Sequence, residues 1–169
     1  MEPADLHQSS PPGATRQLLR LSVAHEAMLV PIDAVREILE LVRLTPLPQS
    51  PGFIAGVMNL RGAVVPVIDV GHRMGLGPIA TSKRTAIVVV EVKGDEEHDK
   101  LITGVLVDAV YEVLEVDTRH IEPVPQLGLP IPAEFIAGMV NLQQRYAALL
   151  SLDQVLSPAL LTRLIGEPA

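Results

Sequence analysis

The side chains best suited to acid–base or metal chemistry are five histidines, at His7, His25, His72, His98 and His120. No two of them have the spacing of a metal-binding motif such as HExxH. Asp69 with His72, and Asp117 with His120, have the residue types of acid–base pairs, but no nucleophile motif such as GxSxG accompanies them. We therefore interpret both pairs as accidents of spacing.

Motifs that would hold a metal ion, a nucleotide or a reactive thiol are also missing. The acidic run at 95–99 contains His98 but is typical of a solvated turn, because it offers no rigid set of ligands. Gly71, Gly75 and Gly77 match neither a P-loop nor a dinucleotide-binding motif, and the chain has no cysteine. The sequence thus predicts no metal, no cofactor and no catalytic residue, and the protein is not expected to be an enzyme.

The composition argues against nucleic-acid and membrane partners. The chain has a net charge of −7, its 13 Lys and Arg residues do not cluster, and only four side chains are aromatic. A nucleic-acid site would therefore lack both phosphate-neutralising cations and stacking rings. No apolar run reaches the roughly 18 residues of a membrane-spanning helix, and the N-terminus lacks the apolar core of a signal peptide. These patterns predict a cytoplasmic protein that inserts into no membrane.

Aliphatic residues dominate the apolar fraction and favour strands, because β-branched side chains suit a pleated sheet. Strands are predicted at residues 17–23, 27–31, 54–60, 63–69, 85–92, 101–107, 110–116, 135–142 and 145–152. The strand at 85–92 is apolar throughout, so we expect it to be buried on both faces. Pro66 inside the strand at 63–69 predicts an edge strand or a bulge. Residues 1–15 are rich in proline and serine and are expected to form a disordered tail.

Helices are predicted in three places. Apolar residues recur at helical spacing over 32–42, opposite charged ones, which predicts a helix that ends before Pro46. Its apolar face would hold Ile32, Val35, Ile38, Leu39 and Val42, and its charged face Asp33, Arg36, Glu37 and Glu40. A short helical turn is expected within 71–77. A C-terminal helix in the segment 157–169 would begin with Ser157 as its N-cap.

An internal repeat is the strongest signal in the chain. Phe53-Ile54-Ala55-Gly56-Val57-Met58-Asn59-Leu60 recurs as Phe135-Ile136-Ala137-Gly138-Met139-Val140-Asn141-Leu142, with six of eight positions identical. The repeated units span 53–69 and 135–153, and each follows a proline-rich loop, forms a hairpin and ends near an aspartate, Asp69 or Asp153. The repetition predicts two similar small β-barrels packed about a pseudo-two-fold axis.

The two hairpins differ at their tips. The first has Arg61-Gly62, a tight two-residue turn in which glycine supplies a positive φ, and the second has Gln143-Gln144. Because the fold does not need a charge at one tip, this difference indicates a function located on the first half.

Taken together, these landmarks resemble the CheW family of chemotaxis coupling proteins over residues 16–156. The residues that carry the resemblance are Leu29-Val30-Pro31, Asp33-Ala34-Val35-Arg36-Glu37-Ile38, Phe53-Ile54-Ala55-Gly56, Asn59-Leu60-Arg61-Gly62, Val65-Pro66-Val67-Ile68-Asp69, Gly104-Val105-Leu106-Val107-Asp108 and the second copy of the repeat. The loop from Met74 to Arg84 has no clear family signature, and the second hairpin lacks the Arg-Gly tip. The pathway, swimming chemotaxis, pilus-driven motility or another receptor–kinase system, therefore stays open.

The resemblance implies a mainly β fold of two five-stranded SH3-like barrels with short helices and an apolar seam between them. It also implies a non-catalytic scaffold that bridges a chemoreceptor's cytoplasmic tip and the regulatory domain of a CheA-type histidine kinase, next to the membrane receptors. The kinase is expected at the first barrel and the receptor in the groove between the barrels. The partner-binding residues carried over by motif are Val35, Glu37, Gly56, Arg61 and Gly62.

Each of these positions also has a structural interpretation. Arg61 and Glu37 could be solvated surface charges, which usually contribute little. Gly56 could serve a bulge or a tight bend, as its repeat partner Gly138 suggests, and Val35 lies on the face assigned to the core. An alternative function is a small-ligand-binding or enzymatic β-barrel, which would need a pocket with converging polar groups.

Overall fold

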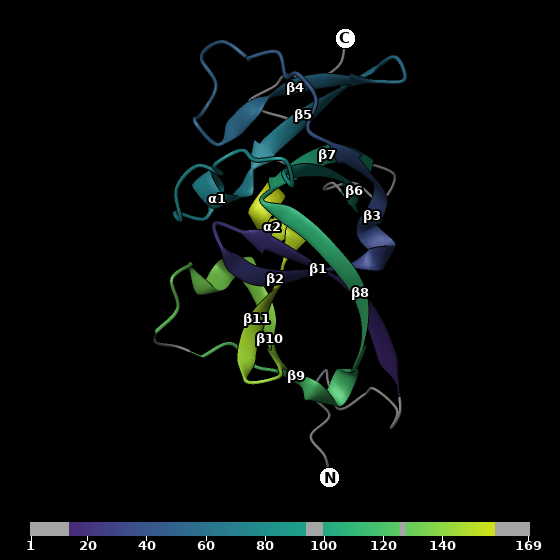
Figure 1. The fold of residues 1–169 in the computed structure, drawn as a ribbon, viewed down its shortest axis with the longest axis vertical. Coiled ribbons are helices and arrows are strands. Elements are labelled where there is room, and N and C mark those ends of the chain that lie inside the picture. The colour runs from purple at the N-terminus through teal and green to yellow at the C-terminus, as the bar shows by residue number, and fades with distance from the viewer. Residues whose placement is uncertain (1–13, 94–99, 126–127, 158–169) are drawn as a thin grey trace.

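The computed structural model describes residues 14–93, 100–125 and 128–157, and in these residues the strands form two sheets (Figure 1). The first sheet has the order β3 (Val35–Glu40), β6 (Ala86–Lys93), β7 (Lys100–Val107), β5 (Ala63–Asp69) and β4 (Ile54–Leu60). The second has the order β8 (Ala109–Asp117), β1 (Thr15–Val23), β2 (Glu26–Pro31), β11 (Arg145–Leu150), β10 (Ile136–Leu142) and β9 (Ile121–Glu122). The mainly β prediction with two β subdomains is confirmed, while the SH3-like classification stays a prediction. The first sheet has the five strands expected of each barrel, but the second has six, because the short β9 is added to it.

Both sheets curl round and close in the same way. The chain that leaves β3 reaches Thr45, whose backbone exchanges two hydrogen bonds with Val57 of β4 at 2.9 and 2.8 Å. The chain that leaves β8 passes through η2 (Thr118–His120) into β9, which pairs with β10. In each sheet the chain that follows the first strand thus pairs with a strand of the hairpin at the opposite end, β4 or β10, and we name the two sheets the first and the second barrel.

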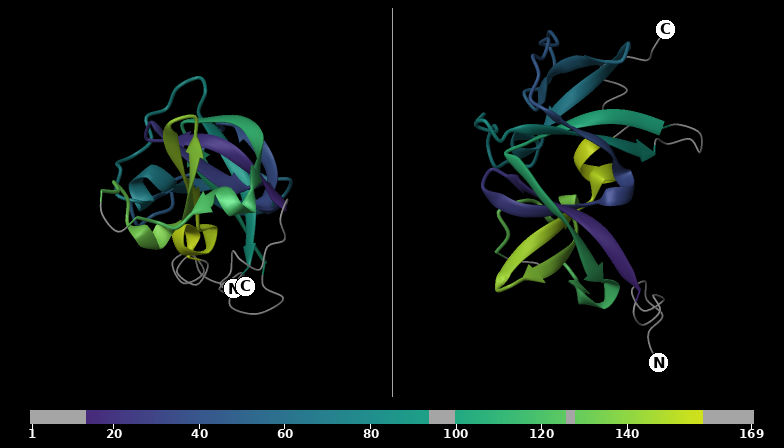
Figure 2. Two further views of the ribbon diagram at one scale, coloured as in Figure 1. Left: turned by 90° about the horizontal axis from the view of Figure 1, so that it is seen from below. Right: turned by 45° about the vertical axis from the view of Figure 1, so that its right-hand side comes forward.

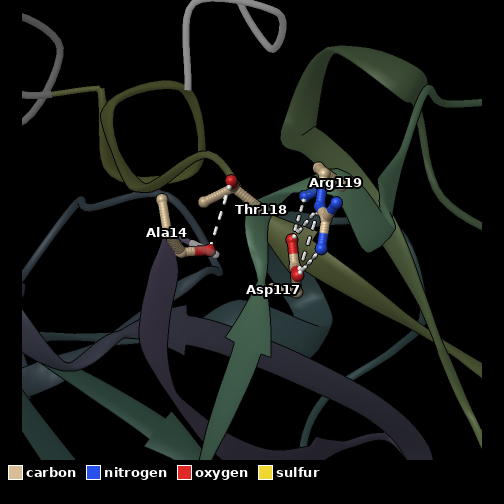
Figure 3. Close-up of polar contacts among 4 residues, drawn as sticks. All are labelled: Ala14, Asp117, Thr118 and Arg119. Atoms are coloured by element: carbon tan, nitrogen blue, oxygen red, sulfur yellow. Dashed lines mark hydrogen bonds and ion pairs between the residues drawn. The ribbon is translucent and has the colours of Figure 1, made fainter. Parts of the chain in front are cut away.

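The second barrel is also fastened where β1 begins. The Thr118 backbone N–H and hydroxyl both donate to the carbonyl of Ala14, at 3.1 and 3.4 Å (Figure 3). Next to this contact the Asp117 carboxylate accepts hydrogen bonds from the backbone and the guanidinium of Arg119, and these bonds hold the pKa of Asp117 far below its usual value. The start of β1 is therefore tied to the end of β8.

The strand order extends the internal repeat to residues 15–73 and 86–156, and these two longer repeats exchange their opening hairpins. The first repeat (15–73) contributes β3, β4 and β5 to the first barrel, but its opening hairpin β1–β2 lies in the second barrel. The second repeat (86–156) contributes β8 to β11 to the second barrel, but its opening hairpin β6–β7 lies in the first. Parallel pairs join the exchanged hairpins to their hosts, β5 with β7 and β11 with β2. Figure 2 shows the purple β1–β2 hairpin, from the start of the chain, lying among the green and yellow strands from its end.

The apolar core is shared between the barrels. A large cluster of buried side chains joins strands of the first barrel, residues of β1 and β2, and the end of the second repeat, including Leu21, Val88, Phe135 and Val155. A smaller cluster that includes Leu18, Leu29 and Leu149 fills the second barrel. As predicted, β6 is buried along most of its length, because strands of the first barrel flank it and its two faces meet this core.

Pro66 occupies a position where its missing N–H is harmless. Its partner Val57 directs both backbone groups toward Thr45, so Val57 and Pro66 form a pair without hydrogen bonds between them. The pairing of β5 with β7 begins only at Val67. The prediction was an edge strand or a bulge. An edge strand is wrong for β5 as a whole, although β5 has only β4 beside it where the proline lies, and a bulge does occur in the pairing of β4 with β5, between Ile54 and Gly56.

The predicted helix over 32–42 is wrong. The structure has a single 3-10 turn, η1 (Ile32–Ala34), followed by β3, which pairs with β6. Half-buried Val35 and Leu39 share the strand with exposed Ile38, and exposed Val42 follows it, so apolar side chains recur at a spacing that imitates a helix although burial alternates along the strand. Pairing with a buried strand outweighs that spacing.

Two details at the ends of elements also differ from the predictions. Ser157 is not an N-cap but the left-handed C-cap of α2 (Leu152–Leu156), and the rest of the predicted C-terminal helix lies outside the described residues. Thr15, placed in the predicted tail, belongs to β1, while residues 1–13 of that tail also lie outside the described residues. The expected short helical turn is present as α1 (Val70–Arg73).

The two repeats also align differently from the sequence interpretation at their ends. Asp69 donates its backbone N–H to the carbonyl of Phe53, and Ser151, not Asp153, makes the same bond to Phe135. Asp69 and Ser151 are also the N-caps of α1 and α2. The buried Asp69 carboxylate accepts from the backbone N–H of His72 at 3.1 Å and from that of Ile79 at 3.0 Å.

We expect Asp69→Ala to lower the free energy of unfolding by about 2 kcal/mol, because it removes a helix cap and leaves a buried N–H unpaired. Asp153→Ala, at an exposed position in the first turn of α2, is the control and should change stability by less than about 0.5 kcal/mol. Urea unfolding of both variants measures the difference. Equal losses would mean that Asp69 does not hold α1 and its following loop in place.

Candidate protein-interaction site

The tip of the β4–β5 hairpin is a rigid two-residue turn. Arg61 and Gly62 both have positive φ, 52° and 89°, as a type I′ hairpin turn requires. The side-chain carbonyl of Asn59 accepts the backbone N–H of Gly62 at 3.0 Å and braces the turn from inside. Gly62 therefore shapes the tip, and Arg61 is the side chain that the tip presents.

Arg61 pairs with Glu37, although the sequence interpretation placed its side chain in open solvent. The two guanidinium Nη atoms donate to the two carboxylate oxygens of Glu37 at 2.6 and 2.8 Å, a bidentate pair between the hairpin tip and β3. The Arg61 side chain stays 71% exposed, while Glu37 is 26% exposed. The structure thus brings together two of the five residues carried over by motif.

Each partner of this pair stabilises the charge of the other. Hydrogen bonds from Arg61, and more weakly its positive charge and that of Arg36, hold the pKa of Glu37 below its usual value near 4.5. The Glu37 carboxylate in turn raises the pKa of Arg61. Both groups are therefore charged at neutral pH, and a partner meets a fixed, oriented guanidinium.

The strands β3 and β5 also expose apolar side chains. Ile38 follows Glu37 in β3 and is 44% exposed, and Val64 lies opposite Asn59 in β5 and is 69% exposed. Leu41 and Val42, just beyond β3, are exposed as well. A fixed ion pair on a barrel that also exposes apolar side chains suits protein recognition, because the apolar groups supply contact area and the charges supply orientation. Sequence reasoning missed these residues because it assigned Ile38 and Val42 to a helical core face.

Val35 and Gly56 are less accessible than the pair. Val35 begins β3 opposite Val90 and packs, half-buried, against the large core cluster. Gly56 is buried, has φ of +149°, and lies so close to the Leu44–Thr45 backbone that an added Cβ would stand 2.7 Å from the Thr45 carbonyl oxygen. Its counterpart Gly138 gives β9 the same access, since a Cβ there would stand 2.6 Å from Ile121. The structural alternative therefore accounts for Gly56.

The second barrel repeats the turn but not the charges. Gln143 and Gln144 also have positive φ, and Asn141 accepts the Gln144 N–H at 3.0 Å, as Asn59 does in the first barrel. The strand β8 of the second barrel corresponds to β3 of the first. Its Glu112 forms a bidentate pair with Arg20 of β1 and not with the hairpin tip. Arg20 also lies over the ring of Tyr111, 4.4 Å from its centre. This second pair was missed, because only the strand register brings Arg20 and Glu112 together.

A cavity of about 400 Å³ lies elsewhere, between the end of β6, η1 and the start of α2. Its lining residues are Pro31, Ala34, Glu91, Val92, Lys93, Leu150, Ser151, Leu152 and Asp153. Glu91 is already engaged by Arg36 and Lys100. In the part of the chain that the structure describes, no three His, Asp or Glu side chains gather as a metal ion would need, and no helix is long and apolar enough to cross a membrane.

Known proteins share this architecture. The CheW-like domain family matches residues 17–159. Chemotaxis protein CheW of Rhizobium meliloti is 36% identical over 140 residues, covering 83% of this chain and 86% of that protein, and protein FrzA of Myxococcus xanthus is 36% identical over 112 residues, 66% of each chain. The crystal structure of the scaffolding protein TtCheW from Thermoanaerobacter tengcongensis is similar with a TM-score of 0.73 and 33% identity, covering 86% of this chain and 88% of that one.

We expect Gly56→Ala to destabilise the protein by about 2 to 4 kcal/mol, because the new Cβ meets the Thr45 carbonyl and the backbone is strained. Gly62→Ala is the matched control: its φ is +89°, but no described atom lies within 4 Å of the new Cβ, so only about 1 kcal/mol of backbone strain applies. Denaturant unfolding measures both. A larger loss for Gly62→Ala would contradict the close approach at Gly56.

We expect Arg61→Gln to return the pKa of Glu37 toward its usual value near 4.5, because the hydrogen bonds that lower it are lost. Since the folded-state pKa is lowered, the pair stabilises the fold above that usual value, and this stabilisation is lost as pH falls through the folded-state pKa. Carboxyl ¹³C shifts followed by NMR over pH 2–7 measure the change. Glu91, whose pKa is lowered by Arg36, is the internal control and should titrate unchanged.

Proposed function

The chain belongs to the CheW-like domain family, and from this premise we propose that it is a non-catalytic scaffold that couples chemoreceptors to a histidine kinase. It acts through surface complementarity in chemotaxis-type signalling and changes no covalent bond. It works in the cytoplasm, next to the membrane-embedded receptors to which its partners connect it.

The observation that supports this proposal most directly is the bidentate Glu37–Arg61 pair on the hairpin tip. Glu37 holds the guanidinium in one orientation, so the Arg61 side chain loses little conformational entropy when a partner docks there. Arg61 has five N–H donors and uses two on Glu37, which leaves three for carboxylate or carbonyl groups of a partner. Exposed Ile38 and Val64 add apolar contact area on the same barrel.

The two partners occupy different parts of the protein. The regulatory domain of the kinase docks on the first barrel at Glu37 and Arg61. The residues Val35, Gly56 and Gly62 hold the backbone of this surface in its shape. The receptor tip docks in the groove between the barrels. Because one partner contacts a single barrel and the other contacts both, changes at the hairpin tip and changes in the barrel arrangement affect binding differently.

We expect Arg61→Asp to weaken binding of the kinase regulatory domain by roughly tenfold or more, because it places a second carboxylate beside Glu37. Titration calorimetry with the purified kinase domain and a receptor fragment from the same genome measures the effect. Arg119→Asp is the matched control, because Arg119 is an exposed arginine of the second barrel whose ion pair, among the residues that the structure describes, is with the neighbouring Asp117.

The double variant Glu37→Arg with Arg61→Glu reverses the pair and separates its two roles. If the pair only stabilises the turn, the double variant binds like the wild type. If the orientation of its charges guides docking, the double variant stays weak. Unchanged kinase and receptor affinity in Arg61→Asp would remove this surface from the binding site.

A further inference from the structure

Arg73 joins the two barrels at their junction. It is the last residue of α1, and its Nε donates to the carbonyl of Val155 at 2.8 Å while one Nη donates to that of Gln154 at 3.3 Å. Both carbonyls belong to α2, which lies between the barrels (Figure 1). Its guanidinium carbon also lies 5.2 Å from the ring centre of Phe53 and 4.9 Å from that of Phe135, the two copies of the phenylalanine that begins the repeated motif.

The alignment of the repeats shows why this position is special. Because Asp69 and Ser151 are counterparts as helix N-caps, counting onward makes Val155 the counterpart of Arg73. Arg73 therefore bonds to the backbone of its own counterpart, between the two copies of the same phenylalanine. A residue meets its counterpart in this way only beside the pseudo-two-fold axis. An arginine at both positions would place two positive guanidinium groups side by side at that axis, and the valine of the second copy avoids this repulsion.

The other contacts between the barrels are mostly aliphatic. The large core cluster joins side chains of β1 and β2 to strands of the first barrel, and such packing is strong but not directional. Arg73 differs because its planar guanidinium combines two hydrogen bonds with two ring contacts. If one barrel rotates relative to the other, at least one of these four contacts is lost. It is half-buried, so water competes only partly for its donors.

We propose that Arg73 is a positioning residue that fixes the angle between the barrels and so holds the groove between them ready for the receptor. Without it the apolar layer still holds the barrels together, but in a wider range of angles. If only about a tenth of the molecules then have the receptor-competent angle, the apparent receptor affinity falls by about tenfold. The part of this inference that concerns the receptor rests on the proposed function, and the part that concerns the angle does not.

Distance measurement between the barrels tests the angle directly. Because the chain has no cysteine, Glu40→Cys in β3 and Glu115→Cys in β8, both exposed, provide one spin label on each barrel. Pulsed electron paramagnetic resonance should give a narrow distance distribution that broadens in Arg73→Met and stays narrow in the control Arg119→Met. An unchanged distribution in folded Arg73→Met would overturn the inference.

Arg73→Lys covers the case in which Arg73→Met does not fold. Lysine keeps the charge but lacks the planar fork, so its distribution should be broader than that of the wild type, and an unchanged distribution would again overturn the inference. In the same variants the receptor fragment should bind about tenfold more weakly, while the kinase regulatory domain changes by less than about twofold. Equal losses for both partners would overturn the positioning role. If the wild type binds neither partner, the proposed function fails, while the distance result still decides the role of Arg73 in the barrel angle.

Discussion

Neither barrel of this protein can close with the strands of its own repeat, and most of the other features follow from that constraint. The β1–β2 hairpin completes the barrel of the second repeat, and β6–β7 completes the barrel of the first. Each hairpin is held on both sides by strands of the other repeat, so β6 is buried on both faces and the main apolar cluster extends across both barrels. The barrels are consequently one cooperative unit rather than two modules joined by a linker.

Local sequence patterns were sufficient to predict the structure where strands pair with the next strand along the chain. The two hairpins of the repeat were predictable within a few residues, because their two-residue turns and alternating pattern act over short distances. The strand β3 was not, since its pairing with β6 joins residues about fifty positions apart and its exposed apolar residues imitate helical spacing. Asp153 was mistaken for the counterpart of Asp69 because the sequence shows an aspartate but not which residue caps the helix.

The sequence indicated two residues of the candidate site but not its geometry. The repeat and the family resemblance directed attention to Arg61 and Glu37, yet nothing in the sequence indicates that a hairpin tip reaches across to β3. The pair of Arg20 and Glu112 left no signal either, because β1 and β8 are distant in the chain. Gly56 had two interpretations, and only the closeness of the Thr45 backbone distinguishes them.

The duplicated backbone therefore carries two different surfaces. Asn59 and Asn141 brace the same turn in both halves, while the carboxylate of the edge strand finds its arginine at the hairpin tip in one half and on the adjacent strand in the other. The exchange of hairpins has a consequence for descent as well. Since every barrel mixes both copies, a gene encoding either copy alone would yield a chain whose opening hairpin has no host except a second molecule. A chain with a single copy would thus complete its barrels only as a hairpin-swapped homodimer, whereas in this protein both copies lie in one chain and each half has its own side chains at the hairpin tip.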